Sequence, residues 1–160
     1  MALKIGDKAP DILLPDQKGV FASLKDFRGK WIVVYFYPRD LTPGCTVEAK
    51  DFSKKKDQFE LDNAIIFGIS PDPPGTHCQF IEKEKLTIRL LSDSDKAVLK
   101  AYNAWGEKSM YGKLFFGVLR STFLVDPMGK IAWIWPKVKP EGHAQEVKKK
   151  LEELQKIKHD

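Results

Sequence analysis

Two continuous apolar runs, residues 31–37 (WIVVYFY) and residues 64–70 (AIIFGIS), most strongly limit how this chain can fold. Each has the length of a strand and shows no polar alternation, which is typical of strands buried on both faces. Pro38 ends the first run, and apolar residues at helical spacing over residues 46–63 predict a helix between the two strands. This order of strand, helix and strand predicts an α/β domain in which a sheet lies between helices.

After a loop-like start, the rest of the chain predicts more short elements of both kinds. They are helices at residues 76–85, 95–102 and 142–157, a strand at residues 88–91, and a β-hairpin formed by residues 121–126 and 130–135. Thr76 is a candidate N-cap for its helix. The length of 160 residues fits one globular domain. We therefore expect residues 1–160 to form a single α/β domain with a central mixed β-sheet flanked by helices.

The chain carries a formal net charge of +5, from 27 Lys and Arg against 22 Asp and Glu. Five lysines lie near its end: Lys148, Lys149, Lys150, Lys156 and Lys158. Such a stripe can contact nucleic acid or acidic lipid, but Lys mixed with Glu along one predicted helix is more typical of a solvated face. No apolar segment is long enough to span a membrane, and the start lacks the pattern of a secretory signal. We therefore expect a cytoplasmic protein with no nucleic-acid or membrane partner.

The chain contains two cysteines, Cys45 and Cys78, which are too few for a disulfide scaffold and lack the spacing of zinc-binding pairs. In a reducing cytosol such cysteines are catalytic or structural. The histidines, His77, His143 and His159, do not cluster in the sequence, so no metal site is expected. We expect His77 to pack or cap at the start of its helix rather than to act as a base or ligand.

Cys45 lies where the first strand gives way, through the loop PRDLTPG, to the first helix. The free backbone N–H groups and the positive end of the helix dipole favour an anion at that position, and a thiolate is such an anion. Thr42 lies three residues earlier, close enough for its hydroxyl to reach the sulfur or a bound peroxide. Pro38 and Pro43 stiffen the loop. On these grounds alone Cys45 is either a reactive thiol or a small buried apolar residue, as most free cysteines are.

The pattern P-x-x-x-T-x-x-C, formed by Pro38, Thr42 and Cys45, is similar to the signature of the peroxiredoxins. It most resembles the bacterioferritin-comigratory (Q-type) branch, in which the strand ends in an aromatic-Tyr-Pro run and Cys-Thr-x-Glu follows. Three further segments resemble that branch: IGDKAPD with LPD near the start, WGEK with MYGK in the middle, and RSTFLVD at residues 120–126. The resemblance covers nearly the whole chain. It implies a thioredoxin-like fold and a thiol peroxidase that needs no metal, haem or flavin cofactor.

The resemblance also assigns a role to each residue of the candidate site. Cys45 attacks a peroxide oxygen and becomes a sulfenic acid, with release of water or an alcohol. Thr42 hydrogen-bonds the reacting oxygens, and Arg120 stabilises both the thiolate and the charge on the leaving oxygen. Pro38 shields the sulfenic acid from water, and Glu48 orients Arg120. The plainer interpretations are a surface ion pair for Arg120 and a solvated helix charge for Glu48.

The chain departs from the branch at the resolving cysteine. Many members place it five residues after the nucleophile, where this chain has Lys50, and others place it near the position of Ile81. Cys78 lies three residues before Ile81 and so on nearly the same helical face. A Cys45–Cys78 disulfide would require local unfolding of the first helix. The alternative is a one-cysteine peroxidase, or a redox sensor or holdase, in which Cys78 is purely structural.

The resemblance implies hydrogen peroxide and organic hydroperoxides as substrates, thioredoxin or a similar dithiol protein as the reductant, and a monomer or weak dimer. A thiol–disulfide oxidoreductase would need a Cys-x-x-Cys pair, which Cys45 does not form. A basic nucleic-acid-binding module has only the charge in its favour. Trp133 and Trp135 alternate on a predicted strand, so a sheet face or a subunit contact accounts for them better than stacking on a nucleobase.

Overall fold

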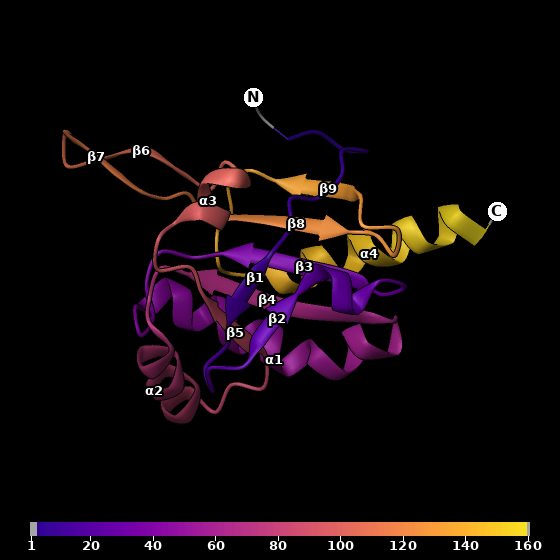
Figure 1. The fold of residues 1–160 in the computed structure, drawn as a ribbon, viewed down its shortest axis with the longest axis horizontal. Helices are drawn as coiled ribbons and strands as arrows, with labels where there is room; N and C mark the ends of the chain where they lie inside the picture. Colours follow the sequence, from indigo (N-terminus) through magenta and orange to yellow (C-terminus); the bar gives the residue numbers. More distant parts are fainter. Residues whose placement is uncertain (1–2, 160) are drawn as a thin grey trace.

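A five-stranded mixed β-sheet forms the centre of the computed structural model, which describes residues 3–159 (Figure 1). Its strands, in spatial order, are β5 (Arg89–Ser92), β4 (Ala64–Ser70), β3 (Trp31–Phe36), β8 (Ser121–Val125) and β9 (Ile131–Trp135). β3, β4 and β5 run parallel, whereas β8 is antiparallel to β3 and β9 is antiparallel to β8. The predicted mixed sheet is therefore confirmed.

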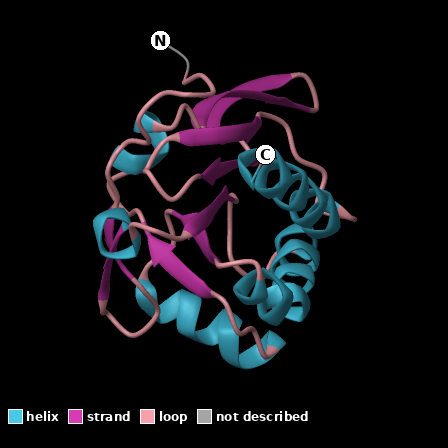
Figure 2. Ribbon diagram, turned by 90° about the vertical axis from the view of Figure 1, so that its right-hand side faces the viewer, coloured by secondary structure: helices cyan, strands magenta, loops and turns pink. Residues whose placement is uncertain are grey.

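The central strand β3 is buried on both faces, and its alternating side chains divide the core in two. Ile32, Val34 and Phe36 point into one cluster, and Val33 and Tyr35 point into the other. The second cluster also contains apolar residues of three helices: α1 (Pro43–Leu61), α2 (Pro74–Glu84) and α4 (His143–His159). Figure 2 shows the longer helices together along one side of the sheet. Cys45 belongs to this helix-covered cluster.

The opposite face of the sheet is covered largely by elements that the sequence pattern did not predict. Instead of a loop-like start, the chain forms β1 (Leu13–Pro15), β2 (Phe21–Ser23) and the 3₁₀ helix η1 (Leu24–Phe27). β1 and β2 pair antiparallel over three residues each. These elements are too short to show a clear apolar period. The short helix α3 (Ala97–Ala101) completes this layer.

Residues 105–118 form a second unpredicted hairpin, which projects from the body of the protein (Figure 1). It consists of β6 (Trp105–Met110) and β7 (Lys113–Val118). The two-residue turn is Tyr111-Gly112, with φ of 53° and 76°, as expected for a tight hairpin turn. Most of its side chains are exposed, so they do not follow the alternating pattern of a half-buried strand.

Some predicted boundaries were wrong by a few residues. Thr76 is not the N-cap of α2: the helix begins at Pro74, and Pro73 is the N-cap residue. Proline is well suited to the first helical position because its N–H would be unpaired there in any case. The predicted helix at residues 95–102 shortens to α3, and the predicted strand at residues 88–91 is β5, one residue later. The predicted helix at residues 142–157 is confirmed as α4.

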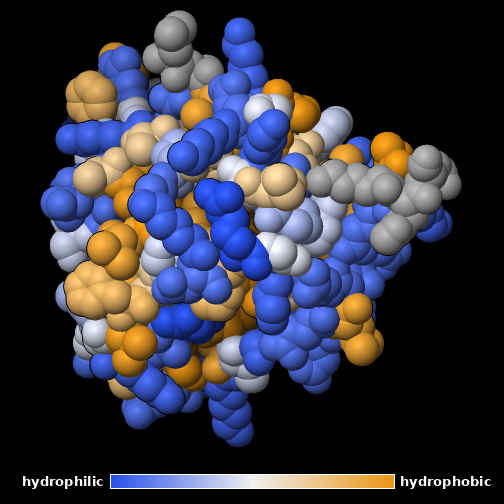
Figure 3. Space-filling view, turned by 45° about the vertical axis from the view of Figure 1, so that its right-hand side comes forward, coloured by the Kyte–Doolittle hydropathy of each residue, from blue (hydrophilic) through white to orange (hydrophobic). Residues whose placement is uncertain are grey.

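The lysine-rich end of the chain packs against the protein. The Lys148 amine lies 2.6 Å from a carboxylate oxygen of Asp62, and Lys150 lies 4.0 Å from the centre of the Trp133 ring. Trp135 contacts His143 edge-on, so Trp133 and Trp135 share the helix-covered sheet face, as predicted. The face in Figure 3 is largely hydrophilic, with apolar side chains in small groups. No helix within residues 3–159 combines the length and the apolar character needed to cross a membrane.

Candidate active site

Cys45 is the third residue of α1, and its side chain is 1% exposed. Thr42 is the N-cap residue and Pro43 occupies the first helical position, where a missing N–H costs nothing. Cys45 therefore lies among the first four N–H groups of the helix, at the positive end of the helix dipole. Leu41, just before the N-cap, has a φ of 66°, in the left-handed region that disfavours side chains. The loop that leads to Cys45 thus carries backbone strain.

Arg120, immediately before β8, connects Cys45 to Glu48. Its Nη2 donates to the Cys45 sulfur at 3.1 Å, and its Nη1 donates to Oε1 of Glu48 at 2.6 Å. The Arg120 side chain is 16% exposed and that of Glu48 is fully buried. Burial by itself would lower the pKa of Arg120, but the negative charges of Glu48 and Cys45 raise it. The structure thus places a permanent positive charge next to the sulfur. The ion pair of Arg120 with Glu48 is buried rather than on the surface.

Glu48 lies one turn after Cys45 on α1 and faces inward, so it is not a solvated helix charge. Burial raises the pKa of Glu48 from 4.5 to about 7, and the positive charge of Arg120 only partly opposes this rise. Its second oxygen, Oε2, is buried without a hydrogen-bond partner among the described residues. The carboxyl group therefore titrates near neutral pH, and its bond to Arg120 is stronger when it is ionised.

We expect the Glu48→Gln variant to remove a pH dependence of stability. The pKa of Glu48 is raised from 4.5 to about 7, so the folded state favours the neutral carboxyl, and this contribution is lost as pH rises through about 7. Between pH 4.5 and about pH 7, the unfolding free energy of wild type should therefore fall by about 3 kcal/mol relative to that of the variant. Urea unfolding of both reduced proteins at several pH values measures this difference. A difference that stays constant with pH would contradict it.

The Thr42 hydroxyl donates to the backbone carbonyl of Arg39 at 2.8 Å. Its oxygen retains lone pairs that can accept a hydrogen bond, while the Thr42 carbonyl accepts from both the N–H and the hydroxyl of Thr46. Pro38 follows β3 at the start of the same loop and is half-buried. The structure therefore brings Thr42, Pro38 and Cys45 onto one short segment.

Three residues near Arg120 were missed by the sequence analysis. A Cβ on Gly44 would lie 3.3 Å from Cγ of Pro140 and 3.4 Å from Nη2 of Arg120, so a side chain there would crowd Pro140 and touch the guanidinium group. Pro140 precedes α4 and is brought to the site only by folding. Lys108 of β6 is a further neighbour: burial and Arg120 lower its pKa, and Cys45 raises it. The projecting hairpin thus adds a second positive charge near the sulfur.

Cys78 lies near the start of α2 and is exposed, whereas Cys45 is buried. Both are free thiols, so the structure holds the reduced protein. Lys50, at the position where many relatives have the resolving cysteine, pairs with Glu84 of α2 at 3.8 Å. Because Cys45 is enclosed, a bond between the two sulfurs requires the start of α1, α2 or both to leave the positions described here.

The histidines with described side chains have separate packing roles. His77 is fully buried at the start of α2, as the packing prediction expected, and it does not cap the helix. His143 bonds to Thr122 at 2.8 Å and to Glu146 at 2.9 Å in a different network. The side chain of His159 lies outside the described residues.

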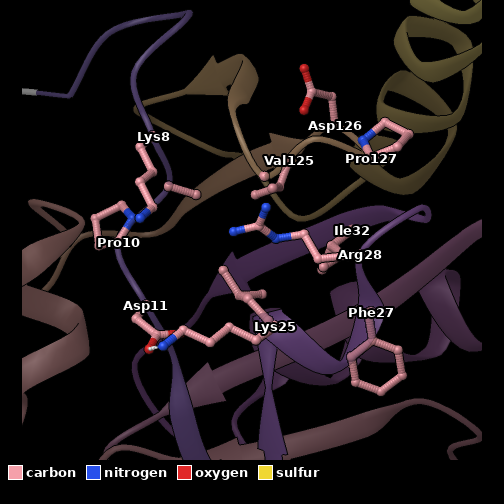
Figure 4. A pocket seen from close by; sticks show the side chains of 13 residues that line it. Lys8, Pro10, Asp11, Lys25, Phe27, Arg28, Ile32, Val125, Asp126 and Pro127 are labelled. Atoms are coloured by element: carbon pink, nitrogen blue, oxygen red, sulfur yellow. Dashed lines mark ion pairs between the residues drawn. The ribbon is translucent and has the colours of Figure 1, made fainter.

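A hollow of about 320 Å³ opens beside η1, on the sheet face opposite to Cys45. Figure 4 shows the Arg28 guanidinium group below Val125, and Lys25 paired with Asp11. Its cationic side chains are exposed, and no residue of the Cys45 site lines it. The candidate chemistry therefore lies at the start of α1.

Comparison with known proteins agrees with this geometry. Residues 5–134 match the model of the AhpC/TSA family. The peroxiredoxin Bcp of Bacillus subtilis is 42% identical over 154 residues, covering 96% of this chain and 98% of that protein. A structure of PrxQ from Xylella fastidiosa superimposes with a TM-score of 0.90 at 38% identity, covering 95% of this chain and 97% of that one.

A second similar structure is that of the bacterioferritin comigratory protein of Xanthomonas campestris, which is described by its alkyl peroxide reduction activity. It superimposes with a TM-score of 0.84 at 40% identity, covering 88% of this chain and 90% of that one. The similar structures, the similar sequences and the family model all indicate the same family. The chain therefore belongs to the AhpC/TSA family and is a peroxiredoxin of the bacterioferritin-comigratory (Q-type) branch, a thiol-dependent peroxidase with a thioredoxin-like fold.

Proposed function

We propose that Cys45 is the peroxide-attacking nucleophile of this enzyme, acting within a single domain of residues 1–160. The observation that carries the proposal is the 3.1 Å bond from Arg120 to a cysteine sulfur at a helix N-terminus. Both the guanidinium charge and the helix dipole stabilise a thiolate, which is the reactive form of cysteine. Most free buried cysteines lack such an electropositive environment.

In the proposed reaction the Cys45 thiolate attacks the terminal oxygen of a hydroperoxide. An S–O bond forms, the O–O bond breaks, and the leaving alkoxide or hydroxide takes a proton to become an alcohol or water. Arg120 donates to the sulfur, so it supports the initial charge there, and its guanidinium group would also support the charge that develops on the oxygen leaving next to that sulfur. Thr42 accepts a hydrogen bond from the peroxide. Pro38 shields the sulfenic acid from water, and Glu48 orients Arg120.

We further propose that the sulfenic acid on Cys45 condenses with the Cys78 thiol, with release of water. The exposure of Cys78 favours this role, because a purely structural cysteine is usually buried. The resulting disulfide would be reduced by thioredoxin or a similar dithiol protein, which restores both thiols and is itself oxidised. The alternative is a one-cysteine cycle in which an external thiol attacks the sulfenic acid directly, or a sensor in which Cys45 oxidation changes a binding surface.

Replacing Cys78 with serine separates these cycles. If Cys78 resolves the sulfenic acid, Cys78→Ser still reacts once with hydrogen peroxide at the wild-type rate, but steady-state turnover with thioredoxin falls about a hundredfold or more. Single-turnover Trp fluorescence and coupled turnover measure the two steps. Full retained turnover would favour the one-cysteine cycle. In both cycles Cys45 remains the nucleophile, so a loss of the first reaction in Cys78→Ser would contradict the proposal.

We propose that the protein works in the cytoplasm as a monomer or weak dimer, with hydrogen peroxide and organic hydroperoxides as substrates. No nucleic-acid partner is proposed, because two of the lysines near the chain end are engaged within the protein: Lys148 pairs with Asp62, and Lys150 pairs with Glu153 and covers the Trp133 ring. Sedimentation at several protein concentrations tests the oligomeric state.

A further inference from the structure

A buried polar network holds the loop that leads to Cys45, and the proposed chemistry does not use it. Asp40 lies in this loop and is 4% exposed. Its Oδ1 accepts from the Tyr37 hydroxyl at 2.6 Å, its Oδ2 lies 2.6 Å from Nδ1 of His77, and its backbone N–H donates to Asp72 at 2.8 Å. Asp40 therefore ties the loop to β3, to the start of α2 and to the turn between β4 and α2.

The hydrogen bonds of His77 determine how many protons this network holds. Nε2 of His77 lies 3.0 Å from the backbone carbonyl of Leu91, which can only accept, so Nε2 carries a proton. In neutral histidine, Nδ1 then has no proton. Its 2.6 Å contact with Oδ2 of Asp40 would bring two lone pairs together unless a further proton lies between them. The pair is therefore either imidazolium with carboxylate or neutral imidazole with carboxylic acid.

A metal ion does not fit this contact. Asp40, Asp72 and His77 are residue types that ligate metals, and their ligand atoms lie within 4.8 Å of one another. Ligand atoms in a tetrahedral zinc site, however, are about 3.3 Å apart because each lies about 2 Å from the ion. The 2.6 Å contact between Asp40 and His77 is too short for two such ligands and is typical of a charge-assisted hydrogen bond.

The network lies between two segments, at least one of which must move for a Cys45–Cys78 disulfide to form. Leu41, the neighbour of Asp40, has a φ of 66°, and such strain persists only where the surrounding contacts enforce it. The loop then runs through Thr42 to Cys45. On the other side, His77 directly precedes Cys78 on α2. One buried contact thus links the loop before one sulfur to the helix that carries the other.

We propose that Asp40 and His77 are positioning residues that act as a proton-dependent latch: while their shared proton is present, the Cys45 loop and the start of α2 stay closed, and its removal releases them. This role rests on the proposed function of Cys45 and Cys78. The closed state presents Cys45 to peroxide beside Arg120. The open state allows Cys78 to approach the sulfenic acid.

Other titratable groups face the latch from the elements packed against it. Asp72, from the turn before α2, adds a second negative charge near the imidazole. Tyr35 lies on β3 and Tyr37 directly follows it. Burial, and to a smaller extent nearby negative groups, raises the pKa of both well above 10.0, so they stay protonated. Leu91 of β5 offers only its carbonyl. Rising pH therefore acts on the latch by removing the proton between Asp40 and His77, and the expected direction is opening at higher pH.

Two substitutions separate the proton from the hydrogen bonds. In Asp40→Asn, the amide N–H can donate to the lone pair of Nδ1 of neutral His77 while the amide oxygen still accepts from Tyr37. Every bond is then satisfied without the extra proton. His77→Ala removes the contact altogether. Tyr102→Phe is the matched control, since it deletes another 2.6 Å hydroxyl bond, to the carbonyl of Pro10 on the opposite face of the sheet.

Hydrogen exchange of the reduced protein, expressed as protection factors for the amides of residues 74–84, tests the latch without relying on activity. We expect wild-type protection to fall about tenfold or more as pH rises within the folded range, and Asp40→Asn protection to stay constant. His77→Ala should be about a hundredfold less protected at every pH. Tyr102→Phe should follow wild type. An Asp40→Asn profile that falls as wild type does, or a flat wild-type profile, would overturn the latch, even if His77→Ala fails to fold.

Oxidation of Cys45 by hydrogen peroxide, followed by peptide mass in the same samples, distinguishes the two proposals. In one outcome, amide protection follows the expected pH dependence while peroxide leaves Cys45 unoxidised. That result would overturn the proposed function and leave the exchange result standing. Normal oxidation of Cys45 with pH-independent exchange would overturn the latch alone. If both proposals hold, rising pH speeds disulfide formation in wild type but not in Asp40→Asn.

Discussion

Replacing Cys45 with serine should lower peroxidase activity to the uncatalysed level, a loss on the order of 10⁶-fold, while the protein still folds. A serine hydroxyl cannot act as the soft nucleophile that cleaves the O–O bond, and no other cysteine lies at the start of α1. The serine oxygen can accept the bond that Arg120 now donates to sulfur at 3.1 Å. Stability should therefore change by only about 1 kcal/mol.

Steady-state peroxide consumption and thermal unfolding of Cys45→Ser measure these two effects. Cys78→Ser is the matched control for the first reaction with peroxide, measured in a single turnover, because it removes the other thiol and leaves the Cys45 site intact. Peroxide consumption by Cys45→Ser at more than one thousandth of the wild-type rate would contradict the role of Cys45. Loss of activity together with loss of the folded state would require the more conservative Cys45→Ala variant to decide.

Replacing Arg120 with methionine should lower the rate constant for Cys45 oxidation about a thousandfold. Methionine has a similar length but no charge, so both the thiolate and the leaving oxygen lose their partner. Glu48 would then be buried without a positive charge. Because burial already raises its pKa to about 7 beside Arg120, it should become neutral in the variant. The unfolding free energy should therefore fall by only about 1–3 kcal/mol.

Stopped-flow measurement of the second-order rate constant with hydrogen peroxide tests the role of Arg120. Arg89→Met is the matched control: Arg89, like Arg120, pairs with a buried carboxylate, that of Asp16, but away from Cys45. It should reduce stability and leave the rate constant within a few-fold of wild type. Equal rate losses in Arg120→Met and Arg89→Met would mean that Arg120 acts through stability alone.

The fold was predictable where apolar side chains are buried in long, regular runs. β3 and β4 are fully or nearly fully buried, and their apolar runs therefore matched the pattern of buried strands. α1 and α4 have one face on the sheet and the other in solvent, which produces helical spacing. The β6–β7 hairpin has little buried surface to impose a pattern. Its only local signal was the Tyr111-Gly112 turn.

The candidate site was predictable in part, and for two different reasons. The placement of Cys45 follows from a strand, a loop and a helix that are adjacent in the chain. Its contact with Arg120 spans 75 positions, and only the resemblance to peroxiredoxins brought the two together in the sequence. Gly44 and Pro140 matter through close packing, which no local pattern encodes. The Asp40–His77 contact depends on which nitrogen of His77 faces which carbonyl, and this is set only by the folded structure.

The most direct test of the central claim is the intact mass of the protein after one equivalent of hydrogen peroxide, followed by non-reducing peptide mapping. The account predicts a loss of two hydrogens and a linked peptide that joins Cys45 to Cys78, with no change at either site in Cys45→Ser. Oxygen added to Cys45 without a linked peptide would retain the nucleophile and exclude Cys78 as its resolving partner. A Cys45 peptide of unchanged mass would contradict the assignment of Cys45 as the residue that peroxide attacks.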